Sequence, residues 1–319
     1  MHAVSDPNTH GGDSMADRTV PLIPALIGPT AVGKTAIGIA LAERANGEII
    51  SADSRQVYKG LTIGTSKPDA VSLRRVPHHF IDELEVSEPF SAGLFAQAAS
   101  NRIERILARG RLPIVVGGST LYIEALLHGL ADIPATTAAT RSRLMERLDA
   151  EGARALYEEL RKVDPDSAAT MDETKTHRVV RALEVYLDTG RPLSSYHAES
   201  SGSPFSFAPH VLTRPREELY ERINRRVDLM LADGLIAENR RLLSESEHQD
   251  AMALRTIGYR EPRAYLRGEI SYEEMVRQLK RNTRRYAKRQ LTWFRRHEGY
   301  SWHDLSNYSA SHALVKKLL

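Results

Sequence analysis

Residues 28–35 read Gly28-Pro29-Thr30-Ala31-Val32-Gly33-Lys34-Thr35, which has the spacing G-x-x-x-x-G-K-[ST] of a P-loop. The apolar run before it, residues 21–27, predicts a buried strand, and residues 36–44 after it predict a helix. Two glycines let the backbone turn its N–H groups around an anion, and the helix directs its positive end there. We therefore expect a polyphosphate site, with Lys34 as a mobile charge and the Thr35 hydroxyl suited to Mg²⁺. The motif leaves open which phosphate ester binds and whether it is hydrolysed, transferred or displaced.

Two further strand ends carry polar residues. Residues 47–52 predict a strand that runs into Asp53-Ser54-Arg55-Gln56, and residues 112–116 predict a buried strand followed by Gly117-Gly118-Ser119. In a parallel sheet, ligand chemistry collects beyond the carboxyl ends of the strands. We therefore expect Asp53 to be a catalytic carboxylate facing the P-loop; the alternative is a turn or helix-capping residue. Ser119 offers a hydroxyl in a second candidate anion-binding turn.

The remaining patterns before residue 130 complete an alternation of strands and helices. Helices are predicted over residues 92–109 and 120–127, and a short strand over 78–82. Its paired histidines, His78 and His79, suggest a metal, but neighbouring strand residues point to opposite faces and cannot easily share an ion. The alternation predicts an α/β fold with a P-loop NTPase-like parallel sheet core.

The chain divides into four parts by composition. Residues 1–20 are polar and are expected to be a disordered leader, and residues 21–132 form the first part of the core. Residues 133–200 predict an inserted all-helical subdomain, with linkers at 135–140 and 194–209 and helix throughout 141–185. Residues 201–319 return to the core with a last short strand, 210–213, and a helix over 216–232. A capping box, Ser271 to Glu274, then opens a long basic helix to about Arg296 with an inward stripe that includes Gln290.

Composition excludes some classes of function and leaves others open. The chain has no cysteine, which excludes disulfides and thiolate metal sites, and no apolar run near the roughly 20 residues that span a bilayer. Net charge is only +3, but residues 255–296 hold thirteen Lys or Arg against four acids. Such an excess is typical of a surface for a large polyanion, although a solvated helix face has the same composition.

Eight segments, in order and with similar spacing, resemble the bacterial tRNA dimethylallyltransferases. They are 28–35, Ser51-Ala-Asp-Ser-Arg-Gln-Val-Tyr58, Gly64-Thr-Ser-Lys-Pro68, His78-His79, Val116-Gly-Gly-Ser-Thr-Leu-Tyr122, Arg181-Ala-Leu-Glu-Val185, Ile257-Gly-Tyr259 and Tyr286-Ala-Lys-Arg-Gln-Leu-Thr-Trp-Phe294. The resemblance implies transfer of a dimethylallyl group from dimethylallyl diphosphate to the N6 amine of adenosine 37. That adenosine lies 3′ of the anticodon, in tRNAs reading codons that start with U. It further implies a Mg²⁺-dependent enzyme, and we expect a cytoplasmic monomer.

The same resemblance implies roles for individual residues. The P-loop would bind the diphosphate leaving group, Arg222 and Arg226 are the alternative candidates to clamp it, and Thr35 would ligate Mg²⁺. Asp53 would be the general base, and Ser119, where the family usually has threonine, would keep a catalytic hydroxyl. The residues implied in contact with the tRNA anticodon stem-loop are Asp53, Ser54, Arg55, Gln56, Ser119, Arg141, His177, Arg178, Val179, Val180, Arg181, Leu254, Arg255, Gly258, Tyr259, Arg260, Lys288, Arg289, Gln290, Trp293 and Arg295.

Three other functions fit parts of the sequence. A related adenylate prenyltransferase would label ATP or AMP and leave RNA unlabelled. A P-loop kinase of small metabolites would need only the first 130 residues, and it gives the basic segment 255–296 no purpose. A P-loop RNA-binding protein without catalysis would lose no chemistry with Asp53.

Overall fold

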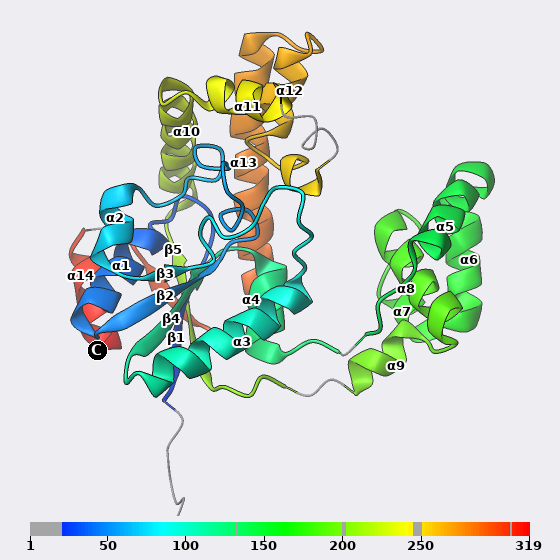
Figure 1. The fold of residues 1–319 in the computed structure, drawn as a ribbon, viewed down its shortest axis with the longest axis horizontal. Coiled ribbons are helices and arrows are strands. Elements are labelled where there is room, and N and C mark those ends of the chain that lie inside the picture. Colours follow the sequence, from blue (N-terminus) through cyan, green and yellow to red (C-terminus); the bar gives the residue numbers. More distant parts are fainter. Residues whose placement is uncertain (1–20, 132, 200–201, 245–250, 307) are drawn as a thin grey trace, which may run out of the picture.

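The computed structural model describes residues 21–131, 133–199, 202–244, 251–306 and 308–319. Within them, six parallel strands form one sheet in the order β3-β2-β4-β1-β5-β6 (Figure 1). The strands are β1 (Ile23–Ile27), β2 (Gly47–Ala52), β3 (His78–His79), β4 (Leu112–Gly117), β5 (Phe207–Thr213) and β6 (Ser301–Asp304). The predicted α/β class is confirmed. The expected leader, residues 1–20, lies outside the described residues.

Helices bury both faces of the sheet. Leu26 and Ile27 in β1 are both fully buried and belong to separate apolar clusters, one on each face. Helices α1 (Lys34–Arg44) and α14 (Tyr308–Leu318) cover one face, with α2 (Ala70–Arg75) beside α1, and α3 (Ala92–Ala108) and α4 (Thr120–His128) cover the other. Burial on both faces explains why β1, β2 and β4 read as continuous apolar runs.

A second group of helices extends beyond the carboxyl ends of the strands, and the last part of α13 (Tyr272–Phe294) runs back beside α4 (Figure 1). It comprises α10 (Arg216–Ala232), α11 (Leu235–Ser244), a 3₁₀ turn (Met252–Leu254), α12 (Arg260–Leu266) and α13. Helix α13 is the long predicted helix, and the Ser271 side chain caps it by accepting from the Glu274 N–H. This group therefore lies over the edge where the loops of β1, β2 and β4 emerge.

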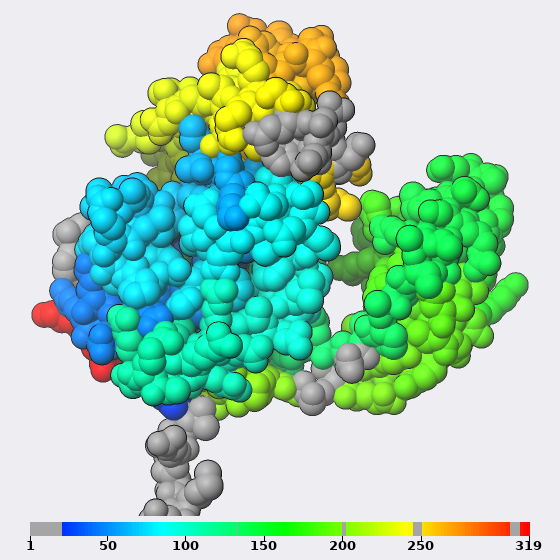
Figure 2. Space-filling model, viewed as in Figure 1, coloured from blue at the N-terminus to red at the C-terminus, as the bar shows by residue number. Residues whose placement is uncertain are grey.

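Helices α5 to α9 stand apart from the sheet with an apolar core of their own (Figure 1). They are α5 (Ala138–Glu151), α6 (Ala153–Val163), α7 (Pro165–Ala169), α8 (Thr176–Thr189) and α9 (Leu193–Ala198). Leu144, Leu156, Leu160 and Leu183 are fully buried among them. Figure 2 shows open space between this lobe and the core.

Several boundaries differ from the sequence predictions. The linker expected at 135–140 is wrong in its second half, because Thr137 caps α5 and helix begins at Ala138. The linker expected at 194–209 contains α9, and Ser194 N–H donates to the buried Asp164 carboxylate at 3.1 Å, which fixes the start of that helix. Residues 207–209 already belong to β5, so the strand starts three residues earlier than predicted.

Two strand predictions also need correction. The strand expected over 78–82 ends at His79, because Phe80 and Asp82 adopt positive φ values of 66° and 53° that turn the chain. The strand at 210–213 is not the last one, because β6 adds to the sheet beside it.

Candidate active site

Three loops begin at the same level of the sheet. Gly117 at the end of β4 pairs with Ile27 at the end of β1 and with Ala52 at the end of β2. A Cβ on Gly117 would lie 2.3 Å from the Ala52 carbonyl oxygen, so the close approach of these strand ends requires glycine there. This register brings residues 28–35, Asp53 and Ser119 to one edge, as the strand-end argument predicted.

The P-loop depends on its two glycines. Gly28 and Gly33 have φ values of 146° and 112°, in the region that glycine adopts readily. A Cβ on Gly28 would also lie 2.5 Å from the Leu212 carbonyl oxygen of β5. Helix α1 starts directly after Gly33, so its N-terminal end faces the space enclosed by the loop. Such an end attracts anions.

Lys34 is held inside this loop. Its Nζ donates to the carbonyl oxygens of Gly28 at 3.0 Å and Pro29 at 2.8 Å. Burial, and after it the charge of Arg226, lower the pKa of Lys34 to about 7 against the opposing charge of Asp53. A lysine in this state gains its proton most readily when an anion arrives.

Three arginines around α10 hold the outer side of the P-loop. Arg214 Nε donates to the Val32 carbonyl at 2.9 Å, Arg222 Nε donates to the Ala31 carbonyl at 2.9 Å, and Arg226 Nη1 donates to Thr30 Oγ1 at 3.3 Å. Burial and then the neighbouring cations lower the pKa of both Arg222 and Arg226. The site thus concentrates positive charge that a bound anion would neutralise.

Two adjoining cavities meet at Asp53. One, of about 310 Å³, is lined by Lys34, Thr35, Arg222 and other residues of the P-loop side. The other, of about 280 Å³, is lined by Ser119, Arg55 and residues of α10, α13 and the 256–258 turn. Their walls have six residues in common: Thr30, Asp53, Thr65, Ser66, Arg226 and Tyr286. The carboxylate of Asp53 can therefore reach a group in either cavity.

Hydrogen bonds fix the polar groups around Asp53. Its Oδ1 accepts from the N–H groups of Arg55 at 2.9 Å and Gln56 at 3.3 Å. Ser119 is buried, and its Oγ accepts from the Ser54 N–H at 2.9 Å, which ties the turn after β4 to the turn after β2. Burial, reinforced by the charge of Asp53 and opposed by Ser119, raises the pKa of Tyr286 to about 12.

The residues implied in RNA contact fall into three groups. Exposed ones are Arg141, His177 and Arg178 on the α5–α9 lobe, and Arg255, Arg260, Lys288, Arg289 and Arg295 on the core; Arg181 and Trp293 are half-buried. Ser54, Arg55 and Gln56 lie at the cavities. Val179, Val180, Leu254 and Tyr259 are buried, so their side chains are not presented at the surface, whereas the buried Gly258 and Gln290 line the cavities.

Sequence reasoning assigned no role to Arg214 or Tyr286. Arg214 directly follows β5, so the strand-end rule that selected Asp53 and Ser119 could have selected it as well. Tyr286 lies on the predicted inward stripe of α13, but helical periodicity does not say which cavity an inward residue lines.

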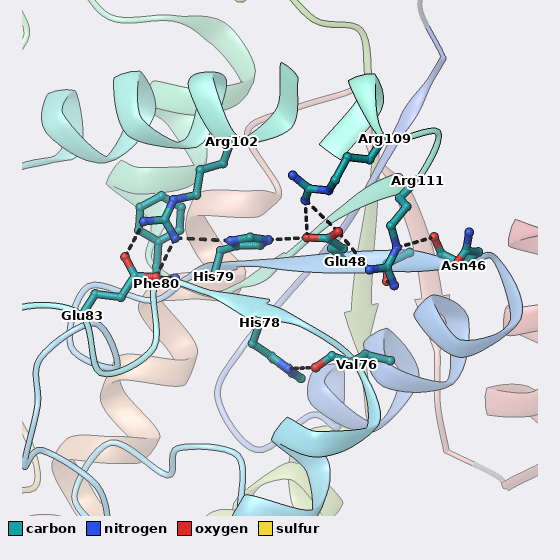
Figure 3. A network of polar contacts seen from close by, with 11 residues as sticks. Asn46, Glu48, Val76, His78, His79, Phe80, Glu83, Arg102, Arg109 and Arg111 are labelled. Carbon is teal, nitrogen blue, oxygen red and sulfur yellow. Dashed lines mark hydrogen bonds and ion pairs between the residues drawn. The ribbon is translucent and has the colours of Figure 1, made fainter. Parts of the chain in front are cut away.

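The paired histidines belong to separate structural contacts (Figure 3). His79 Nε2 contacts the buried carboxylate of Glu48 at 2.6 Å, which also accepts from Arg109 and Arg111. His78 points to the other face, where Nδ1 contacts the Val76 carbonyl at 2.9 Å. The two side chains therefore point to opposite faces of the strand, as the argument from neighbouring strand residues predicted.

Glu124, His128 and His297 form another cluster, with ligand atoms within 4.8 Å of one another. The two imidazole planes are within 4° of parallel with centroids 5.4 Å apart, and His297 stacks on Tyr300 at 4.6 Å. His128 Nε2 also contacts the Tyr300 hydroxyl at 2.8 Å, so one of its two nitrogens already has a partner within the protein. We assign this cluster to packing between α4 and the end of α13.

The fold and the site together define a P-loop-like α/β protein whose loop shares a cavity with a carboxylate. None of the described helices combines the length and apolar character that a bilayer crossing needs. The sequence model of the IPP transferase family matches residues 56–297. The chain therefore belongs to the IPP transferase family of enzymes, and the resemblance seen in the eight segments is confirmed.

Individual relatives agree with this family. A tRNA dimethylallyltransferase of Salinibacter ruber is 56% identical over 290 residues, which cover 91% of this chain and 89% of the relative. The crystal structure of a tRNA isopentenylpyrophosphate transferase from Bacillus halodurans is 41% identical and superposes with a TM-score of 0.69, covering 93% of this chain and 95% of that one. A eukaryotic dimethylallyltransferase solved acting on tRNA is 30% identical with a TM-score of 0.76, covering 90% and 74%.

Proposed function

We propose that this enzyme transfers the dimethylallyl group from dimethylallyl diphosphate to N6 of adenosine 37 in tRNAs that read codons beginning with U. One observation supports the proposal above all: Asp53 stands where a cavity lined by the P-loop meets a second cavity lined by Ser119 and Arg55. Two substrates could therefore reach one carboxylate from different sides. A kinase of small metabolites would also use two substrate sites, but it would leave the basic segment 255–296 without a purpose.

The P-loop cavity suits a diphosphate leaving group. Residues 30, 31 and 33–35 of the P-loop line it, together with the guanidinium groups of Arg222 and Arg226. As the C–O bond of dimethylallyl diphosphate breaks, its electron pair passes to the diphosphate, and these donors stabilise the growing negative charge. Both arginines line this cavity, so the structure supports a role for each.

The second cavity suits the adenine. N6 attacks C1 of the dimethylallyl group, a C–N bond forms as the C–O bond breaks, and Asp53 accepts the proton that N6 loses. The two N–H groups that donate to Oδ1 hold the carboxylate in place for this transfer. Ser119, already bonded to the Ser54 N–H, fixes the adjoining wall.

A magnesium ion fits the oxygen groups of the P-loop cavity. The Thr35 hydroxyl and the Asp53 carboxylate both line it, and oxygen atoms are the ligands that Mg²⁺ prefers. We propose Thr35 as its protein ligand. The bound ion would add positive charge beside the leaving diphosphate.

The anticodon stem-loop is proposed to lie between the two lobes. Exposed basic residues occur on both: Arg141 and Arg178 on the α5–α9 lobe, and Lys288 and Arg289 on α13 with Arg295 directly after it. Figure 2 shows open space between the lobes. RNA bases outside a helix are recognised after they leave the stack, so adenosine 37 would be extruded into the second cavity. We further propose a cytoplasmic monomer in which residues 133–200 form a subdomain inserted between core segments 21–132 and 201–319.

The test is Asp53→Asn, with Asp233→Asn as a matched control on an exposed position at the end of α10. We expect Asp53→Asn to lower transfer into an unmodified anticodon stem-loop by about 10²–10⁴-fold, while stem-loop binding stays within about twofold. Asp233→Asn should match the wild type. The measurement is mass analysis of tRNA nucleosides after incubation with dimethylallyl diphosphate and Mg²⁺.

Other outcomes would favour the other candidate functions. Label in AMP or ATP without label in RNA would indicate an adenylate prenyltransferase. Phosphoryl transfer from ATP would indicate a kinase. Turnover by Asp53→Asn within tenfold of the wild type would remove Asp53 from the chemistry.

A further inference from the structure

We propose that Gln290 is a positioning residue that joins the P-loop to the turn after β4 and thereby sets affinity for diphosphate, with no direct part in RNA binding. The inference rests on the proposed function, in which the P-loop binds the leaving group. It differs from the role that the resemblance implied, which placed Gln290 among the residues contacting tRNA.

One side-chain amide makes both connections. Gln290 Oε1 accepts from the Thr30 N–H at 2.9 Å, and its Nε2 donates to the Gly118 carbonyl at 2.8 Å. The carboxamide therefore bridges the P-loop and the turn after β4 that carries Ser119. Both bonds join segments far apart in the sequence, 260 and 172 residues from Gln290.

The surroundings leave the amide little freedom. Gln290 is 2% exposed. A Cβ on Gly118 would lie 2.5 Å from Gln290 Nε2, so the glycine makes room for this side chain. Because buried polar groups without partners are costly, the two backbone groups and the amide favour a single mutual arrangement.

The position of Gln290 on α13 separates it from the residues suited to RNA. Lys288 and Arg289, its close neighbours in the sequence, are exposed, whereas Gln290 faces the sheet. Its carbonyl oxygen and an amide N–H are already bonded to backbone. A macromolecule at the surface cannot reach the side chain, but a ligand in the 310 Å³ cavity lies directly beside it.

Loss of the amide should therefore change the P-loop site. Among the hydrogen bonds of the described residues, Thr30 makes two. Its N–H donates to Gln290, and its hydroxyl accepts from Arg226. Without the first bond, the Thr30 N–H loses its partner and nothing ties residue 30 to the turn of Gly118, although Lys34 and Arg222 still bond the carbonyls of residues 29 and 31. The preorganisation of the loop for diphosphate would be lost with it.

The experiment compares Gln290→Met, which keeps the length but not the hydrogen bonds, with Gln278→Met, a control on the outer turn of the same helix. Calorimetry measures the Kd of inorganic diphosphate, and fluorescence anisotropy measures the Kd of an anticodon stem-loop. We expect Gln290→Met to raise the diphosphate Kd by about 10- to 100-fold, because each of the two lost hydrogen bonds contributes up to roughly tenfold to the preorganisation of the loop. The stem-loop Kd should stay within about twofold of the wild-type value. Gln278→Met should change neither Kd by more than about twofold.

Each other result would overturn the inference. Weaker stem-loop binding with unchanged diphosphate binding would make Gln290 an RNA contact. Equal loss of both, or no change in either, would make it a general packing residue. If Gln290→Met does not fold, Gln290→Asn gives the same test, because its shorter amide cannot reach both backbone groups. Failure of the wild type to bind diphosphate at all would instead refute the proposed function.

Discussion

The proton on Lys34 gives a quantitative test of the P-loop site. Burial, together with the charge of Arg226, lowers the pKa of this lysine to about 7, in spite of the opposing charge of Asp53. At pH 8 about a tenth of the free sites then carry the proton, and at pH 6 about nine tenths do. A diphosphate bound beside Nζ favours the charged form and raises this pKa.

Diphosphate binding should therefore take up a proton, and the number depends on pH. We expect the contribution of Lys34 to be about 0.9 proton per site at pH 8 and about 0.1 at pH 6. The sign follows from the direction of the shift: the bound state holds more protons than the free state, so the association constant falls as pH rises above about 7. The fall should approach tenfold per pH unit.

Calorimetry of inorganic diphosphate in two buffers of different ionisation enthalpy counts these protons. Lys34→Arg is the matched control, because arginine keeps the positive charge but stays protonated throughout this range. The titration of the diphosphate itself is common to both proteins, so their difference isolates Lys34. Equal proton uptake by wild type and Lys34→Arg at pH 8 would refute the reasoning, because Lys34 would then be charged before the anion arrives.

Two stability predictions test the frame around the site by urea unfolding. Gly64→Ala would place a Cβ 2.6 Å from Cζ of the fully buried Tyr259, so we expect a loss of about 1–3 kcal/mol; Gly299→Ala, with no atom within 4 Å, should stay within about 0.5 kcal/mol. Glu48→Leu removes the buried partner of the half-exposed Arg109 (Figure 3). We expect the free energy of unfolding to fall by about 2 kcal/mol, less than the roughly 3–5 kcal/mol lost when one partner of a fully buried ion pair is removed. A loss below about 0.5 kcal/mol in either variant would contradict its argument.

Local pattern was sufficient to predict the first half of the core. The strands that became β1, β2 and β4 are apolar throughout because helices cover both of their faces, and glycine-rich turns mark their ends. The strand-end rule then placed residues 28–35, Asp53 and Ser119 at one edge without knowledge of the packing.

Elements that depend on distant partners could not be predicted in this way. Strand β6 reads Ser-Trp-His-Asp, has no apolar run, and exists because β5 offers it an edge. Residues 207–209 of β5 include Pro209, and proline disfavours a strand that pairs on both sides. These residues pair with β1 but not with β6, which pairs with β5 only from His210 on. This part of β5 is therefore an edge of the sheet, where proline is tolerated. Helix α9 forms where Tyr196 packs into the cluster of Ala131 and Val185.

Within the site, the side chains that depend on distant contacts were likewise not predictable from local sequence. The P-loop spacing predicts where the anion binds, but the groups that set the geometry of the loop come from Arg214 after β5, from α10 and from α13. Helical periodicity placed Gln290 on an inward face, and only the packing of α13 against the turn of Gly118 shows that its amide is bonded to backbone. Because the loop is held by residues more than 170 positions away, its binding geometry depends on contacts from the second half of the core. The first 130 residues, which alone would suit a kinase, therefore contain the motif without the contacts that shape it.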